Sequence, residues 1–213
     1  MTQLLHPLLE EYINTHSSPE NQTLFNLNRE THLKALMPQM LSGQVQGKFL
    51  EFIARMIQPV RILEIGTYTG YSAICLARGL AEGGKITTID VNAELTAMVE
   101  KYAEAEQLLH AFDIRIGQAM QIIPTLPGFF DLVFIDADKR NYCNYFDAVI
   151  NKVKTGGWIL ADNVLWDGKV VNAEQDKDTK AIDAYNKKLK GDARVETVIV
   201  SLRDGISIAR KIR

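Results

Sequence analysis

After Pro59 the chain alternates short apolar runs with longer segments of helical periodicity, and this alternation restricts the fold more than any other sequence feature. The runs are rich in β-branched and aromatic residues and are bounded by Asp, Gly or Asn, as is typical of buried strands. The predicted helical segments between the runs, at about 93–107, 120–126 and 142–153, are long enough to cross over between parallel neighbours. We therefore expect an α/β fold built on a mostly parallel sheet. The predicted strands of this part span residues 60–65, 85–90, 112–116, 131–136 and 157–162.

The C-terminal end of the chain departs from this alternation. Two further strands are predicted at 194–201 and 205–211, and only a few residues separate them. A link so short permits only an antiparallel pair. The chain has 213 residues, of which 46% are hydrophobic, so it can bury a full core, and its length fits a single domain over 1–213 better than two.

The N-terminal residues carry apolar positions at three- and four-residue spacing. This spacing predicts a helical N-terminal segment, 1–57, placed before an α/β core over 58–213. Ser18 is predicted to cap the start of a helix in this segment, and Pro38 should end that helix. A third helix is expected over 43–57.

Composition and charge narrow the class of protein. The formal net charge of −2 offers no basic footprint of the kind expected for extensive binding to nucleic acid or anionic membranes. The two cysteines, Cys75 and Cys143, fall inside predicted helices, where packing as small apolar side chains is expected rather than a disulfide. No apolar run approaches the roughly 18 residues of a membrane span, and the start lacks a cationic targeting region, so a cytoplasmic protein is expected.

Two short polar clusters stand where predicted strands end. Asp136, Asp138 and Lys139 follow one strand, and Asp162 and Asn163 follow the next. Ligands bind beyond the carboxyl ends of parallel strands, so the position suggests a metal-binding, catalytic pocket. The clusters supply oxygen ligands only, which suits a hard cation, Mg²⁺ first with Ca²⁺ or Mn²⁺ as alternatives, and does not indicate zinc. The same side chains could instead cap the following turns, and the pattern alone leaves both interpretations open.

A glycine-rich turn from Glu64 to Gly70 joins the first core strand to a helix. The backbone can approach a ligand closely at such a turn, and Asp90, which ends the next strand, could accept hydrogen bonds from ribose hydroxyls. A dinucleotide fingerprint would need glycine where Tyr68 stands, so a nicotinamide cofactor, and with it a nucleotide-dependent oxidoreductase, is disfavoured. A plain tight turn into a helix is the structural alternative.

These features together resemble a known family. The Glu-x-Gly-x-x-x-Gly turn, the acid that closes the second strand and the C-terminal antiparallel pair resemble the class I S-adenosylmethionine-dependent methyltransferases. Three later motifs resemble the cation-dependent O-methyltransferases, the family of caffeoyl-CoA O-methyltransferase and its bacterial relatives. They are Ile-Asp-Ala-Asp-Lys-Arg-Asn-Tyr at 135–142, Asp-Asn-Val-Leu-Trp at 162–166 and Asp-Gly-Ile at 204–206. The resemblance, from about residue 40 to 210, implies a Rossmann-like, doubly wound, mostly parallel seven-stranded sheet with an antiparallel C-terminal strand pair and N-terminal helices.

The resemblance implies S-adenosylmethionine as the cofactor. Carried over position by position, the family's cofactor contacts would fall on Ser42, Glu64, Gly66, Thr67, Ser72, Asp90, Ala119 and Asp138. Ser72 suits the N-cap of the following helix equally well, and a helix dipole alone would favour an acid at Asp138. Ala119 offers only its backbone, which would suit the adenine.

The resemblance also implies a metal-dependent reaction, in which Asp136, Asp162 and Asn163 would hold the divalent cation. A phenol with a pKa near 10 is a poor nucleophile at neutral pH. Two vicinal hydroxyls that chelate a cation would give an oxygen with a lower pKa, held in line with the methyl group. Besides Asp136, the catalytic residue would be Lys139, which matches the lysine that the catechol-methylating group uses as general base. A merely solvated lysine early in a helix is the alternative.

The acceptor is expected to be a small aromatic diol, of catechol or caffeoyl type. Met40 and Trp166 resemble positions near the acceptor ring, although either could simply be core. Asp167 stands where the plant enzymes have Asn, and the N-terminal segment is shorter than theirs. Recognition of a CoA thioester is therefore left open, and a smaller catechol or another hydroxylated aromatic is an equal alternative.

The sequence also bears on partners and on other functions. The helical N-terminal segment has more apolar positions than a lone surface helix needs, so we expect a homodimer, as in the resembled family. No membrane partner is expected. Some bacterial proteins of the resembled family methylate 5-hydroxyuridine in tRNA, an alternative that the near-neutral charge disfavours. A non-catalytic S-adenosylmethionine-binding protein is the remaining alternative.

Overall fold

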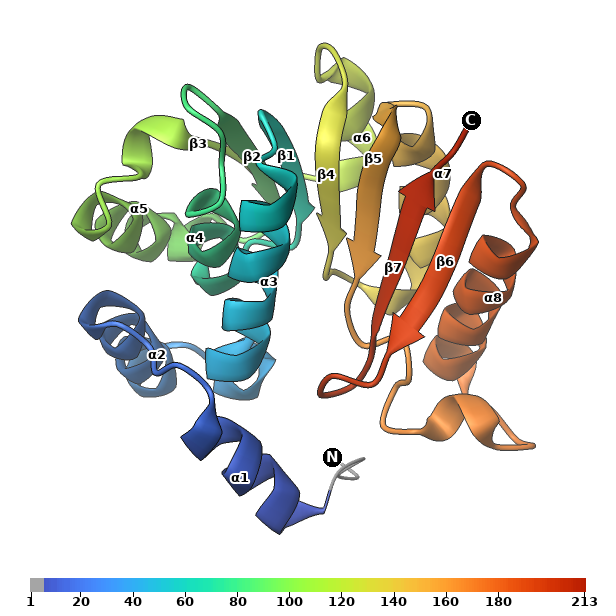
Figure 1. Cartoon of the computed structure of the whole chain (residues 1–213), viewed down its shortest axis with the longest axis horizontal. Helices are drawn as coiled ribbons and strands as arrows, with labels where there is room; N and C mark the ends of the chain where they lie inside the picture. The colour runs from blue at the N-terminus through green and yellow to red at the C-terminus, as the bar shows by residue number, and fades with distance from the viewer. Residues whose placement is uncertain (1–5) are drawn as a thin grey trace.

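A seven-stranded sheet runs through the molecule between two layers of helices (Figure 1). The computed structural model describes residues 6–213, so residues 1–5 of the expected N-terminal segment lie outside the described part. The strands are β1 (Arg61–Ile65), β2 (Lys85–Asp90), β3 (Phe112–Ile116), β4 (Phe130–Ile135), β5 (Val153–Ala161), β6 (Val195–Val200) and β7 (Ile206–Lys211). Their order across the sheet is β3-β2-β1-β4-β5-β7-β6.

Five strands run parallel and the last two are antiparallel, as predicted. β1 pairs with β2 on one side and with β4 on the other, β3 extends the sheet beyond β2, and β5 extends it beyond β4. β7 lies antiparallel between β5 and β6. The doubly wound, mostly parallel sheet with its antiparallel C-terminal pair is therefore confirmed.

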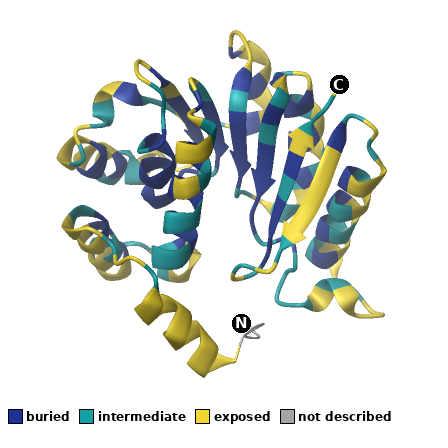
Figure 2. Ribbon diagram, in the orientation of Figure 1, coloured by how far each residue is buried: buried dark blue, intermediate teal, exposed yellow. Residues whose placement is uncertain are grey.

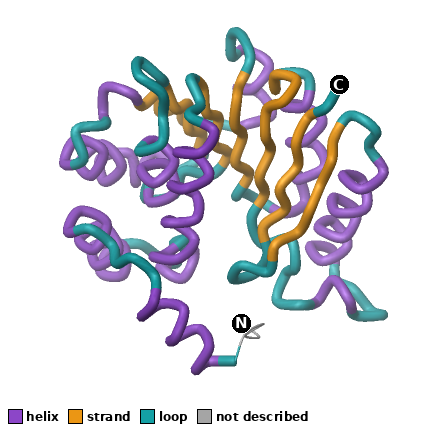
Figure 3. Tube along the Cα trace, viewed as in Figure 1, coloured by secondary structure: helices purple, strands orange, loops and turns teal. Residues whose placement is uncertain are grey.

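Helices lie on both sides of the sheet (Figure 3). They are α1 (Pro7–His16), α2 (Gln22–Lys34), α3 (Gly43–Ile57), α4 (Tyr71–Ala77), α5 (Thr96–Ala105), α6 (Ala119–Ile122), α7 (Tyr142–Ile150) and α8 (Lys177–Gly191). Short 3₁₀ turns are η1 (Pro38–Met40), η2 (Ala93–Leu95), η3 (Leu109–Ala111), η4 (Ile123–Thr125), η5 (Lys139–Asn141) and η6 (Lys169–Val171).

Alternate residues of the central strands face opposite helical layers, because successive side chains of a strand point to opposite faces. Leu63 and Val133 belong to the buried cluster that contains α7 and α8 residues. Ile62 and Leu132 belong to the cluster that contains residues of α3 and α4. Since both faces are covered, these strands are mostly apolar and do not alternate regularly with polar residues.

The N-terminal helices differ from the prediction at one start and one end. α2 begins after Asn21, whose side-chain oxygen accepts the Leu24 N–H at 3.0 Å, so the prediction of Ser18 as the cap is wrong. The Ser18 carbonyl instead accepts a hydrogen bond from Gln44 of α3 at 3.2 Å, and this tertiary contact holds it outside the helix. α2 also ends before Pro38, which opens η1. α3 spans the range that was predicted.

β5 begins at Val153, whereas the sequence pattern predicted a start at Gly157 and a helix up to Val153. The Phe130 N–H donates to the Lys152 carbonyl at 2.7 Å, and Val153 pairs with Phe130 across the sheet. Pairing with β4 therefore extends β5 toward its N-terminus and shortens α7. A long-range contact overrides the local helical periodicity here.

Both cysteines lie in helices, as predicted. Cys75 in α4 is buried, Cys143 in α7 is partly buried, and both are free thiols.

Within residues 6–213 no helix is both long enough and apolar enough to cross a membrane.

Candidate active site

Three strand ends meet at one edge of the sheet, because β1, β4 and β5 are neighbours. Ile65 at the end of β1 lies opposite Ile135 of β4, which lies opposite Ala161 of β5. The hydrogen bonds continue one residue further: the Asp136 N–H donates to the Ile65 carbonyl at 2.8 Å, and the Asp162 N–H donates to the Ile135 carbonyl at 3.0 Å. The glycine-rich turn after β1 and both polar clusters are thereby placed side by side.

The glycine-rich turn packs directly on the end of β4. Gly66 has a φ of +102°, and a Cβ built on it would lie 1.8 Å from the carbonyl oxygen of Asp136. Gly70, at the start of α4, has a φ of +87°. The turn therefore depends on bare backbone at Gly66, which is what close approach to another group requires.

Glu64 is fully buried beneath this turn. Its carboxyl oxygens accept hydrogen bonds from the hydroxyls of Ser72 at 2.6 Å and Thr88 at 2.5 Å. Burial raises the pKa of Glu64 to about 8, although these hydrogen bonds oppose the rise. Thr67 is buried as well, 2.5 Å from the Thr88 hydroxyl. Ser72 makes no capping bond, since its hydroxyl is directed to Glu64.

Asp90 orients the same turn from the end of β2. One carboxylate oxygen accepts the Tyr68 N–H at 2.7 Å, and the other accepts the Asn92 N–H at 2.9 Å. Tyr68 has a φ of +49°, a conformation more usual for glycine. Ala119, at the start of α6, is buried and has no polar side-chain atom to offer.

Lys139 joins the two polar clusters. Its Nζ lies 3.1 Å from Asp136 Oδ1, 2.7 Å from Asn163 Oδ1 and 2.7 Å from the Tyr142 hydroxyl. The lysine side chain is only 12% exposed, against 22% for Asp136. The Tyr142 hydroxyl in turn donates to the Asp162 carbonyl at 3.0 Å. The structure therefore brings four of the sequence-predicted residues into one hydrogen-bonded group.

Asp162 is the most buried of the four sequence-predicted residues in this group, at 3% exposed. Its Oδ1 accepts the Asn163 N–H at 2.8 Å, and its Oδ2 accepts a hydrogen bond from the Gln46 amide at 2.7 Å. Burial, together with the nearby Asp136 charge, raises the pKa of Asp162 to about 6, while Gln46, Lys139 and Arg203 oppose the rise. A buried, hydrogen-bonded carboxylate next to a second carboxylate is a favourable place for a cation.

Asp138 points to a different partner from Asp136. Its carboxylate accepts a hydrogen bond from the Asn141 amide at 2.7 Å and another from the Tyr145 hydroxyl of α7. It occupies the N-cap position of η5 but makes no capping bond. Asp138 is thus fixed by α7, separately from the group around Lys139.

Trp166 borders the Lys139 group through a strained loop. The Lys139 Nζ lies 5.9 Å from the centre of the Trp166 ring. Trp166 and Asp167 have φ of +50° and +55°, which costs energy for residues other than glycine. Asp204, in the link between β6 and β7, holds the loop, because its carboxylate accepts the Asp167 N–H at 2.6 Å.

The two residues predicted near the start of α3 lie in different environments. Met40 ends η1 and is 53% exposed, so a place in the core is excluded for it. Ser42 is buried, and its carbonyl accepts a hydrogen bond from Arg203.

The site also contains four residues that the sequence pattern did not predict: Gln46, Tyr142, Tyr145 and Arg203. Gln46 had a readable signal, because it stands in the helical stripe with Leu50 and Ala54 that α3 buries. A polar residue at such a position needs a buried partner. Arg203 had no comparable signal, since its contacts depend on the folded position of the β6–β7 link.

Among residues 6–213 there is no group of three or more His, Cys, Asp and Glu side chains arranged to hold a metal ion. The candidate set consists of two carboxylates and one amide, so it falls outside that kind of group.

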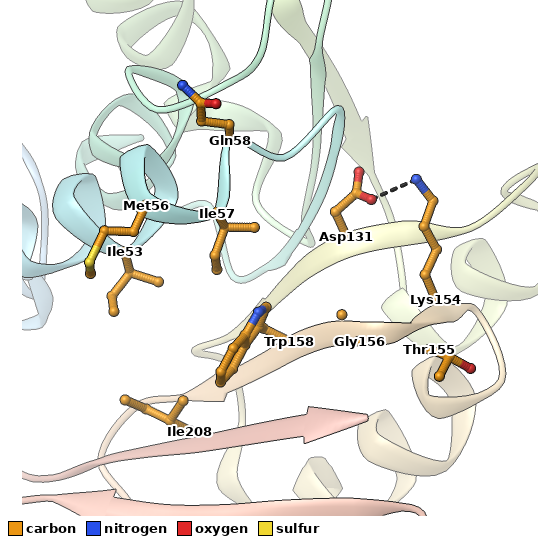
Figure 4. A pocket seen from close by; sticks show the side chains of 11 residues that line it. Ile53, Met56, Ile57, Gln58, Asp131, Lys154, Thr155, Gly156, Trp158 and Ile208 are labelled. Atoms are coloured by element: carbon orange, nitrogen blue, oxygen red, sulfur yellow. Dashed lines mark hydrogen bonds and ion pairs between the residues drawn. The ribbon is translucent and has the colours of Figure 1, made fainter. Parts of the chain in front are cut away.

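A cavity of about 560 Å³ lies at the opposite edge of the sheet (Figure 4). It is lined by Trp158 and Ile208 from the strands and by Ile53 and Met56 from α3, with an ion pair between Asp131 and Lys154 on its rim. Asp131 and Lys154 stand near the starts of β4 and β5, whereas Asp136 and Asp162 follow their ends. This cavity contains none of the sequence-predicted site residues.

Comparison with known proteins finds one family. Residues 14–212 match the family model described as O-methyltransferase. Caffeoyl-CoA O-methyltransferase 1 of Arabidopsis thaliana is 35% identical over 197 residues, which cover 86% of this chain and 76% of the plant protein. Caffeoyl-CoA O-methyltransferase of Medicago sativa is 32% identical over 219 residues, which cover 97% of this chain and 89% of the relative.

Two solved O-methyltransferase structures share the fold. The O-methyltransferase TomG of Streptomyces achromogenes, involved in tomaymycin synthesis and solved in complex with SAM, is 27% identical with a TM-score of 0.89. The match covers 97% of this chain and 96% of TomG. An O-methyltransferase of Bacillus cereus, solved in complex with SAH, is 28% identical with a TM-score of 0.86, over 96% of this chain and 97% of that protein.

Proposed function

This chain belongs to the O-methyltransferase family, and we propose that it transfers a methyl group from S-adenosylmethionine to a small aromatic acceptor. The methyl group would go to one of two vicinal hydroxyls of the acceptor. Asp136, Asp162 and Asn163 would hold a divalent cation. The observation that carries this proposal is the convergence of the Asp136 and Asn163 oxygens on one point, that of Lys139 Nζ, beside the cofactor turn. The relatives named as caffeoyl-CoA O-methyltransferases support an aromatic acceptor.

The donor set fits a divalent cation. Two carboxylates and one amide supply hard oxygen ligands and two negative charges, which suits Mg²⁺ first and Ca²⁺ or Mn²⁺ as alternatives. The oxygens of Asp136 and Asn163 both lie within hydrogen-bond distance of the Lys139 Nζ, at 3.1 and 2.7 Å. The Asp162 carboxylate, fixed by two hydrogen bonds, completes the set.

The cofactor would lie along the turn after β1. Gly66 and Thr67 would offer backbone at the turn, and Asp90 would accept hydrogen bonds from the ribose hydroxyls. Asp138, held by Tyr145, would face the methionine end. Ser42 and Ala119 would border the cofactor. Glu64 and Ser72 would support the turn from beneath without touching the cofactor, because the Glu64 carboxyl is fully buried against Ser72 and Thr88.

In the proposed reaction Lys139 accepts the proton of the attacking hydroxyl at Nζ, and it must enter this step uncharged. With a cation on the Asp136 and Asn163 oxygens, the Tyr142 hydroxyl, 2.7 Å from Nζ, would be the partner that keeps the amine beside them. A bound divalent cation would supply positive charge that favours the ionised form of the acceptor oxygen. The oxygen then forms a bond to the methyl carbon as the carbon–sulfur bond breaks, its electron pair stays on sulfur, and S-adenosylhomocysteine leaves. Trp166 and Met40 would border the acceptor ring.

Methyl transfer to a panel of catechols and matched monophenols, with Mg²⁺ or with EDTA, tests the proposal. We expect turnover of the diols only, loss of turnover in EDTA and its recovery with added Mg²⁺. Asp162→Asn should lower turnover strongly at low Mg²⁺, whereas Asp183→Asn, which changes an exposed pair with Lys187, should not. Unchanged turnover in EDTA would remove the metal role, and no turnover of any diol would remove the acceptor class.

The alternatives gain no support from the comparisons. None of the relatives described above is named for tRNA or for binding without catalysis, and the family match does not favour an oxidoreductase. The cytoplasmic location and the single-domain organisation stay predictions.

We also propose that the N-terminal helices contribute to a homodimer. α1 buries none of its residues (Figure 2), and its Leu8, Leu9 and Tyr12 are 68%, 54% and 59% exposed. Apolar side chains grouped in this way on a surface are typical of an interface. Analytical ultracentrifugation should give a dimer, and replacing the three residues by Ser should shift it toward monomer. The matched control is Val171→Ser, which changes an exposed apolar residue elsewhere; a wild-type monomer at micromolar concentration would contradict the proposal.

A further inference from the structure

Gln46 links three distant segments of the chain at the candidate metal site. It lies on the buried face of α3 and is 0% exposed. Its Nε2 donates to Asp162 Oδ2 at 2.7 Å, and its Oε1 accepts a hydrogen bond from Arg203 Nη1 at 3.0 Å. Both polar ends of the amide are therefore satisfied in the interior, one by a carboxylate and the other by a guanidinium.

The chemistry of these partners fixes the direction of the amide. A guanidinium can only donate hydrogen bonds, and an ionised carboxylate can only accept them. The amide oxygen must therefore face Arg203, and the NH₂ group must face Asp162. A reversed amide would place its oxygen against the carboxylate and its NH₂ group against the guanidinium, so Arg203 acts as the determinant of orientation.

The hydrogen bond from Gln46 settles the position of the Asp162 carboxylate. The other oxygen of this carboxylate accepts the Asn163 N–H at 2.8 Å, so each oxygen has one fixed donor. Two fixed donors prevent rotation of the carboxylate plane and leave each oxygen a further lone pair. A lysine or arginine in place of Gln46 would neutralise the carboxylate directly, whereas a neutral amide leaves its charge for a cation.

We propose that Gln46 is a positioning residue, which orients the Asp162 carboxylate toward the divalent cation, and that Arg203 keeps the Gln46 amide in the orientation this requires. The inference rests on the proposed function, because it takes Asp162 as a cation ligand. Gln46 acts through Asp162 and not by contact with the reacting atoms. Hydrogen-bonded partners of metal ligands commonly change metal affinity by about 10- to 100-fold when they are replaced.

Binding of Mn²⁺ to the full chain, followed by electron paramagnetic resonance of the free ion, provides a readout that is independent of activity. Gln46→Leu keeps the volume of the side chain and removes both hydrogen bonds, and we expect it to weaken Mn²⁺ binding about tenfold or more. The matched control is Gln44→Leu, in the same helix, since Gln44 donates to the carbonyls of Asn14 and Ser18 and not to the site. It should bind Mn²⁺ within about twofold of wild type.

Arg203→Met is a second variant. It removes the guanidinium that fixes the direction of the Gln46 amide. Arg203 lies in the exposed β6–β7 link, so the substitution leaves the interior of α3 unchanged. It should weaken Mn²⁺ binding about threefold or more, less than Gln46→Leu. In catechol methylation, both variants should raise the Mg²⁺ concentration needed for half-maximal rate, while kcat at saturating Mg²⁺ stays within about threefold of wild type. A purely structural defect would not be rescued by added Mg²⁺.

The outcomes separate the two proposals. If wild type binds one Mn²⁺ and both variants bind it equally well, the role of Gln46 is overturned and the metal site stands. If wild type binds no Mn²⁺, the metal site itself fails, and the role of Gln46 is overturned with it. If Gln46→Leu does not fold, Arg203→Met decides: unchanged Mn²⁺ affinity overturns the inference.

Discussion

The carbonyl oxygen of Asp136 occupies the space that a Cβ atom on Gly66 would need, 1.8 Å from its position. The glycine-rich turn and the end of β4 are therefore in close backbone contact at this point. The φ of +102° at Gly66 adds a second restriction, because residues with a side chain rarely adopt it. This contact sets how close the glycine-rich turn lies to the polar cluster at the end of β4.

Gly66→Ala should therefore destabilise the protein and impair cofactor binding together. The added methyl group must push the turn away from β4, at a cost of roughly 3 kcal/mol or more in the free energy of unfolding. Urea unfolding measures the stability, and calorimetry with S-adenosylhomocysteine measures the binding. The matched control is Gly83→Ala, because Gly83 has a φ of +72° with no atom within 4 Å of its Cβ position. It should lose only about 1–2 kcal/mol, from the backbone conformation, and equal losses in both variants would contradict the role given to the contact.

Glu64 should make stability depend on pH. Burial raises its folded pKa to about 8, above the ordinary value of 4.5. Between these two values the folded state holds more protons than the unfolded state, so this contribution to stability is complete below about pH 4.5 and is lost as the pH rises toward 8. Glu64→Gln removes the titrating group, and its stability relative to wild type should rise with pH by about 1 kcal/mol per unit across this window. Urea unfolding of both proteins at several pH values measures this difference, and a constant difference would contradict it.

Lys139→Met should lower kcat for catechol methylation at saturating Mg²⁺ by about 100-fold or more. The reason is that, in the described part of the chain, no other amine lies within hydrogen-bond distance of both Asp136 and Asn163. Affinity for S-adenosylhomocysteine, measured by calorimetry, should change little. Lys169→Met is the matched control, since Lys169 lies at the same 5.9 Å from the Trp166 ring but outside the cluster. Activity of Lys139→Arg near that of wild type would exclude proton transfer by Lys139, because a guanidinium does not give up its proton at neutral pH.

The start of α2 provides a test of the fold. Asn21→Ala should cost about 1 kcal/mol in the free energy of unfolding, because the Leu24 N–H loses its acceptor. Ser18→Ala should change stability by less than about 0.5 kcal/mol, since only the Ser18 backbone is used. Thermal unfolding of the two variants measures the difference, and the reverse order of losses would restore Ser18 as the cap.

The central strands could be predicted because they are rich in apolar and β-branched residues and end at a polar or glycine residue. The ends of β1, β2 and β4 were predicted within one residue for this reason. The start of β5 was not, because residues from Val153 onward become strand only through pairing with Phe130 of β4. Ser18 failed for a related reason: a contact with Gln44 competes with the local capping preference.

The candidate site was predictable where its residues follow strands directly, as Asp136 and Asp162 do. Strand order then determines that they meet, and the motif supplies the residue types. The partners that orient them come from elsewhere: Gln46 from a helix near the N-terminus and Arg203 from the β6–β7 link. No local pattern predicts contacts between segments so distant in sequence, and the direction of Asp138 toward Tyr145 was equally unreadable.

β4 follows β3 in the sequence but pairs with β1, on the far side of the sheet's first half. During synthesis on a ribosome, β1, β2 and β3 therefore emerge before β4 has been made. The glycine-rich turn after β1 can contact Asp136 only when β4 has been made and has inserted beside β1. We expect S-adenosylhomocysteine to protect nascent chains from proteolysis only when they are long enough to include a folded β4. Ligand binding would then report a late step in co-translational folding.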